Sequence, residues 1–118
     1  MSLSEAQEIY EILQRIMELL NGVQVKGQQV AAAEPEVAKS GMTAQQATRI
    51  LYRFNHLLAN LGLPEDLNAA IAVMQRVVFM ARMLEMSLHF LSLSTPYGWI
   101  MGGLGLASVV VELPSLGQ

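Results

Sequence analysis

The sequence contains no cysteine, which excludes disulfide bonds, thiolate catalysis and cysteine-based zinc sites. Charge is also scarce, because Asp, Glu, Lys and Arg make up 14% of the 118 residues, against about 25% in an average soluble domain. Hydrophobic residues make up 53%, and the formal net charge is −3 with no basic cluster that could neutralise phosphates. The composition predicts a chain short of polar surface and argues against nucleic acid as a partner.

Residues that perform chemistry are equally few. His56 and His89 are the only histidines, and neither has a metal-ligating neighbour in the sequence. Asp66 is the only aspartate and stands at an expected helix start, where a capping role explains it. Four arginines on two expected helices suggest at most a modest phosphate-binding patch: Arg49, Arg53, Arg76 and Arg82. We therefore predict no catalytic site, no bound cofactor, no metal site and no enzymatic activity.

Periodicity predicts an amphipathic N-terminal helix over residues 1–21. Apolar residues recur every three or four positions from Ile9 onwards, and Asn21-Gly22 is typical of a helix end. Residues 22–42 lose this period and collect Gly, Gln, Ala and Pro. We predict that they form a flexible or semi-ordered linker.

Residues 43–112 predict a helical hairpin followed by an apolar, glycine-rich C-terminal helix. The first helix should end near Gly62, and the second should begin near Pro64 and run to about Leu93. Such a short connection predicts that the two helices are antiparallel neighbours. With residues 113–118 as a tail, the expected fold is all-α with three to four helices.

The strongest single feature is the absence of Asp, Glu, Lys and Arg from Met86 to Val111. About 20 apolar residues suffice to span a bilayer. Thr95-Pro96 should break the helix here, because proline disfavours helical geometry before it, while Thr95 can cap a helix that begins at Pro96. Two forms stay open, a full reversal like a re-entrant hairpin and a kink that still permits a span. The core of a soluble bundle would have the same composition.

Small residues in this run predict a close contact between helices. Ser94, Gly98 and Gly102 are four residues apart on one helix face, which lets another backbone approach. Tyr97 and Trp99 flank the start of the segment, as aromatic residues do at a membrane interface, although a soluble core uses the same residues. The excess of apolar surface also predicts self-association.

The order of features over residues 65–112 resembles the hydrophobic segments of tail tape-measure proteins of tailed viruses. A Met-rich helix runs from Met74 to Leu93, and Ser-Thr-Pro-Tyr-Gly-Trp-Ile and a glycine-rich apolar segment follow it. The resemblance implies a helical structural protein whose apolar segment helps the genome to cross the host membrane. Tape-measure proteins are usually several times longer, so a separate small virion coat component is a related expectation.

These expectations place the chain in a virion or at a membrane. Its partners would then be further copies of itself, other structural proteins and membrane lipid. Glu5, Glu8 and Glu11 stand where an export signal would be basic and then apolar, so we expect synthesis in the cytoplasm without a signal peptide. The alternative hypothesis is a soluble, oligomeric helical-bundle interaction module with no catalytic activity.

Overall fold

The computed structural model describes residues 3–32, 44–93 and 95–117. These residues form four α-helices and a terminal 3₁₀ helix without any strand, which confirms the predicted all-α class. The elements are α1 (Leu3–Ala32), α3 (Ala44–Ala59), α4 (Leu67–Ser92), α5 (Pro96–Glu112) and η1 (Leu113–Gly117). The molecule is elongated, with extents of 51 × 23 × 20 Å.

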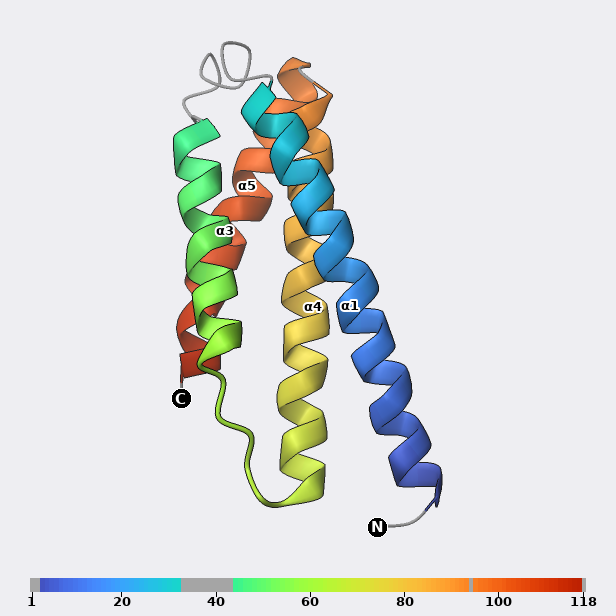
Figure 1. Cartoon of the computed structure of the whole chain (residues 1–118). Helices are drawn as coiled ribbons and strands as arrows, with labels where there is room; N and C mark the ends of the chain where they lie inside the picture. Colours follow the sequence, from blue (N-terminus) through green and yellow to red (C-terminus); the bar gives the residue numbers. More distant parts are fainter. Residues whose placement is uncertain (1–2, 33–43, 94, 118) are drawn as a thin grey trace.

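The helix α4 is the centre of the bundle. Its main neighbours are α1 and α5, which pack along different sides of it (Figure 1). The apolar side chains that it buries recur every three or four residues along one side: Ala70, Ile71, Met74, Val77, Val78, Ala81, Leu84, Leu88 and Leu91. Met80 is buried as well, so α4 contributes more than one face to the core.

The start of α4 differs from the expectation. We predicted a start near Pro64, but the helix begins at Leu67, because Asp66 has extended backbone angles (φ −65°, ψ 124°). The Asp66 carboxylate accepts a hydrogen bond from the backbone N–H of Ala69 at 3.0 Å. This satisfies one of the free N–H groups in the first turn, which is how a helix start is stabilised.

The N-terminal helix is longer than predicted. α1 continues through Asn21-Gly22 to Ala32, so the predicted helix end at residue 21 and the predicted linker from residue 22 are wrong up to that point. The rest of the predicted linker, residues 33–42, lies outside the described residues. Figure 1 shows the N-terminal half of α1 diverging from α4.

Two glycines lie inside α1 at positions where a side chain of a neighbouring helix takes up the space of a Cβ atom. A Cβ atom at Gly22 would lie 2.5 Å from Oε1 of Glu85 on α4, and one at Gly27 would lie 2.6 Å from Cδ1 of Leu51 on α3. Both glycines therefore make room for neighbouring side chains. The apolar stripe of α1 also continues past them, because Val23 and Val30 are buried.

The helix α3 runs antiparallel to α4, as predicted and as Figure 1 shows. The prediction that the two helices are close neighbours is wrong, because α3 packs chiefly on α1, η1 and α5. Phe54, which is 0% exposed, fixes it to the main core. Leu113 at the start of η1 is also fully buried in that core. The expectation that residues 113–118 form a tail is therefore wrong at its beginning, because an apolar side chain there closes the end of the bundle.

Replacing Gly22 by alanine tests the continuous α1. We expect stability to stay unchanged or to rise by up to about 1 kcal/mol, because alanine favours a helix interior by roughly that amount and the Glu85 carboxylate is the free end of a flexible side chain. If Gly22 ended the helix in a left-handed conformation, alanine would instead destabilise the protein. Urea unfolding followed by circular dichroism distinguishes the two results.

Candidate functional site: the α4–α5 hairpin

The turn between α4 and α5 reverses the chain direction. α4 ends at Ser92, and α5 begins at Pro96, with Thr95 in an extended conformation (φ −111°, ψ 154°). The Thr95 hydroxyl oxygen accepts a hydrogen bond from the N–H of Gly98 at 3.0 Å. The helix α5 then packs back along α4 (Figure 1). Of the two forms left open by the sequence, the structure has the reversal.

Replacing Thr95 by alanine should weaken the start of α5. The loss of the capping hydroxyl is expected to destabilise the protein by about 1 kcal/mol, because the N–H of Gly98 would lose its side-chain acceptor. Thr95→Ser keeps that oxygen and should remain within a few tenths of a kcal/mol of the unmodified chain. Equal midpoints of urea unfolding for the alanine and serine variants would contradict this role.

Two glycines on α5 bring the two backbones together. Gly98 and Gly102 are both buried. A Cβ atom at Gly98 would collide with the carbonyl oxygen of Phe90, and one at Gly102 would lie 2.8 Å from the carbonyl oxygen of Ser87 and 2.6 Å from Cγ of Leu91. Both positions therefore require glycine at this distance between the helices. Ser94, the third residue of the predicted contact, lies outside the described residues.

The contact extends one turn beyond the predicted residues, to Gly105. A Cβ atom there would overlap the hydroxyl oxygen of Ser87, which is 3% exposed and donates to the carbonyl oxygen of Met83 at 2.6 Å. The spacing from Gly102 to Gly105 is three residues, which also keeps two side chains on one face. The predicted contact rested on spacings of four residues, which do not include this pair. We call Gly98, Gly102 and Gly105 the glycine seam.

The opposite side of α5 is apolar and exposed. Tyr97, Ile100, Leu104 and Val111 are 65, 62, 61 and 76% exposed, and the exposed Ala107 lies among them. We call these five residues the outer face of α5. It contains no charged side chain, so α5 is apolar on the side that packs on α4 and on the side that does not.

A small groove lies between α4 and α5 beside the outer face. Its volume is about 210 Å³, and it is lined by Met83, Met86, Ser87, Phe90, Met101, Leu104, Gly105 and Ser108. Its two hydroxyls are already bonded within their own helices, since Ser87 donates to Met83 and Ser108 donates to the carbonyl oxygen of Leu104 at 3.1 Å. The groove can therefore accept apolar groups but offers no group for acid-base chemistry.

The two aromatic residues predicted for a membrane interface have different environments. Tyr97 is exposed and contacts the ring of Phe90 edge-on, with 6.1 Å between the ring centroids. Trp99 is half-buried, and its indole N–H is buried with no acceptor among the described residues. The structure therefore does not bring Tyr97 and Trp99 together on one exposed surface.

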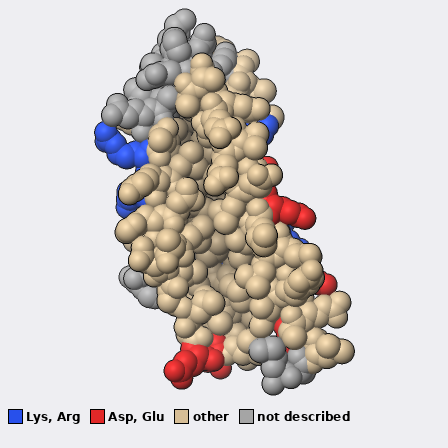
Figure 2. All heavy atoms as spheres, viewed as in Figure 1, with Lys and Arg blue, Asp and Glu red and all other residues tan. Residues whose placement is uncertain are grey.

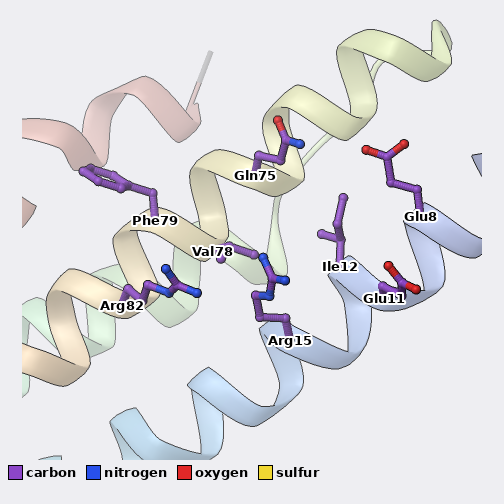
Figure 3. Close-up of a pocket in the computed structure, with 8 residues that line it drawn as sticks. All are labelled: Glu8, Glu11, Ile12, Arg15, Gln75, Val78, Phe79 and Arg82. Carbon is purple, nitrogen blue, oxygen red and sulfur yellow. The ribbon is translucent and has the colours of Figure 1, made fainter.

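A second groove lies between α1 and α4 and has a volume of about 390 Å³ (Figure 3). Glu8 and Glu11 lie toward one end of it, while Arg15 and Arg82 lie toward the other. All four charged side chains are exposed, so solvent screens them and no single charge dominates. This groove has the features of a solvated helix boundary rather than of a ligand site.

The arginines of the predicted phosphate patch are divided between two places. Arg49 and Arg53 line a shallow hollow of about 230 Å³ on α3. Arg82 lies in the α1–α4 groove. Among residues 3–32, 44–93 and 95–117, no three His, Cys, Asp or Glu side chains gather in a way that could hold a metal ion.

Charged side chains are unevenly distributed over the surface. Figure 2 shows charged side chains at the edges of the viewed face and an uncharged middle. Two helical segments of the described chain, Leu67–Ser92 and Pro96–Ser115, are long and apolar enough to cross a membrane, with mean hydropathies of 1.4 and 1.3. Buried core helices of soluble proteins can meet the same criterion, so these values alone do not assign a membrane.

Comparisons with family models, curated proteins and solved structures gave no match. The candidate site is therefore defined by its geometry, namely two helices joined by a capped reversal, a glycine seam and an uncharged outer face.

Proposed function

We propose that this chain is a non-catalytic structural protein whose α4–α5 hairpin becomes buried by neighbouring protein chains in an assembly. The observation that carries the proposal is the outer face of α5, where four large apolar side chains are 61–76% exposed. Exposed apolar surface of this kind is typical of interaction sites. The hairpin supports the role because its backbones are fixed closely together and can present that face without rearrangement.

The charges on α4 favour protein over lipid as the covering material. Arg76, Arg82 and Glu85 all lie within α4, and a complete span by this helix would carry them into the hydrocarbon of a bilayer. At the edge of a protein assembly the exposed Arg76 and Arg82 can remain in water. Burial by protein therefore requires no desolvation of these groups.

Shallow insertion of the hairpin into a membrane is the second candidate function. It is supported by the turn end of the hairpin, where Met86 to Val111 contains no acidic or basic residue. Only this end would enter the lipid, while the charged half of α4 stayed outside. The exposed Tyr97 would then lie near the headgroups.

The assembly that we propose is a virion. The resemblance of residues 65–112 to hydrophobic segments of tape-measure proteins supports this, as does a fold whose described elements are all helices, suited to stacking against other helices. In such a particle the chain would act as a small internal or coat component. Other structural proteins and further copies of the chain would be its partners.

Expression without detergent, followed by fractionation and light scattering, tests the proposal. We expect the full chain in the soluble fraction as a discrete species larger than 12.9 kDa. Leu104→Lys should reduce that association, whereas Gln28→Lys, at an exposed position on α1, should leave it unchanged. Recovery only from carbonate-washed membranes would contradict the proposal and favour shallow insertion.

A further inference from the structure

We propose that the outer face of α5 is the contact through which two copies of this chain form a symmetric, antiparallel dimer. The inference rests on the proposed function in one respect, since it takes the hairpin as an element that protein covers. It goes further by naming the partner, the contact and the position of the two-fold axis.

The surface is large enough for a dimer. The exposed parts of Tyr97, Ile100, Leu104 and Val111, together with the neighbouring Met86, offer about 500–600 Å² from each copy if each large side chain contributes on the order of 100 Å². Two copies would then bury a total of about 1,000–1,200 Å², which clears the roughly 1,000 Å² expected of a biological interface and falls in the class of weak, transient contacts. Buried area alone does not set affinity, but contacts of this class are weak, so we expect a dissociation constant in the micromolar range.

Gly103 indicates what kind of partner covers the face. Glycine weakens a helix interior, and the three glycines of the seam are explained by their contact with α4. Gly103 has no such explanation, because a Cβ atom there would meet nothing within 4 Å. Gly103 is itself partly buried, and Ala107, one turn further on, is small and exposed. A close neighbouring backbone would explain both residues, whereas fluid lipid tails adapt to any side chain.

The outer face suits a second copy of itself. It carries no charge that would need an opposite charge on a different protein, and a two-fold contact places the same surface on both sides. Leu104 is equally far along the helix from Tyr97 and from Val111. In an antiparallel pair the axis therefore passes beside Leu104 and Gly103, where the two helices approach most closely.

Sedimentation equilibrium of the full chain without detergent tests the dimer. We expect the unmodified chain to dimerise with a micromolar dissociation constant. Gly103→Leu should raise that constant at least tenfold, because the new side chain fills space that is open in one copy and occupied in the dimer. Circular dichroism should show unchanged helix content and no loss of thermal stability. Ala6→Leu, a comparable enlargement on the exposed side of α1, should leave the constant unchanged.

Cysteine cross-linking checks the position of the axis. The chain has no cysteine, so Leu104→Cys introduces a single thiol. Two such thiols can form a disulfide only when their Cα atoms come within about 7 Å, which the proposed axis allows. We expect mild oxidation to give a covalent dimer with Leu104→Cys and none with Gln24→Cys on α1 at the same protein concentration.

A monomeric unmodified chain at micromolar concentration would overturn the dimer, and so would a Gly103→Leu variant with an unchanged dissociation constant. If Gly103→Leu loses helix content, Ile100→Glu, at a position that is 62% exposed, gives the same comparison. A monomer that still joins larger particles with other proteins would overturn this inference alone. Recovery only from membranes would overturn the proposed function, and the same variants measured in detergent would still decide the dimer.

Discussion

Replacing Gly102 by alanine is expected to destabilise the protein by about 2–3 kcal/mol. The added Cβ atom would lie 2.8 Å from the backbone carbonyl oxygen of Ser87 and 2.6 Å from Cγ of Leu91, so the two helices must move apart. The gain of about 1 kcal/mol from the better helix propensity of alanine offsets only part of this. Urea unfolding followed by circular dichroism at one fixed protein concentration measures the difference.

The adjacent glycine provides the control. Gly103→Ala adds the same methyl group where nothing lies within 4 Å, so at a protein concentration below the dissociation constant of the dimer we expect it to stabilise the chain by about 1 kcal/mol. The two substitutions should therefore have opposite signs although their positions are consecutive. If both substitutions changed stability in the same direction, Gly102 and Gly103 would not have the different surroundings that the structure gives them.

Local signals in the sequence predicted well where α5 begins and, less closely, where α4 begins. Thr95 and Pro96 carry their own preference for a helix start, because the threonine supplies an acceptor and the proline has no N–H to satisfy. Asp66 acts in the same local way, although the predicted start of α4 was a few residues too early. Such signals need no knowledge of the rest of the fold.

The role of a glycine depends on residues that are distant in sequence. Gly22 and Gly62 look alike locally, since each follows an asparagine closely and an apolar stripe. Gly22 lies inside α1 beside Glu85 of α4, whereas Gly62 follows the end of α3. Both positions were predicted as helix ends, and only the tertiary contact shows that Gly22 is not one.

The candidate site was predictable only in part, because the surroundings of its glycines also depend on residues that are distant in sequence. The spacing of Gly98 and Gly102 indicated a close helix contact, and the structure places both against α4. The spacing could not show that Gly103 faces the opposite way into open space, or that Ser87 is the residue that Gly105 accommodates. Both facts require the rotation of α5 relative to α4, which no local pattern determines.

Replacing Phe54 by alanine is expected to have the largest effect on stability, a loss of about 3–5 kcal/mol. Phe54 is 0% exposed and lies in the main core cluster, so its removal leaves a cavity between α3 and the rest of the bundle. A loss of this size is a large fraction of the 5–15 kcal/mol that is typical of a folded domain. We expect a clear fall in the urea midpoint and partial loss of helix at low urea concentration.

Phe79→Ala is the matched control, because it removes the same side chain from a position that is 59% exposed on α4. Its expected effect is within about 0.5 kcal/mol of zero, since more than half of the residue's surface stays exposed in the folded chain. If Phe79→Ala destabilises as much as Phe54→Ala, a second surface must cover Phe79 in solution. If Phe54→Ala is mild, α3 is not fixed to the core through this ring, and the bundle of α1, α4 and α5 holds without it.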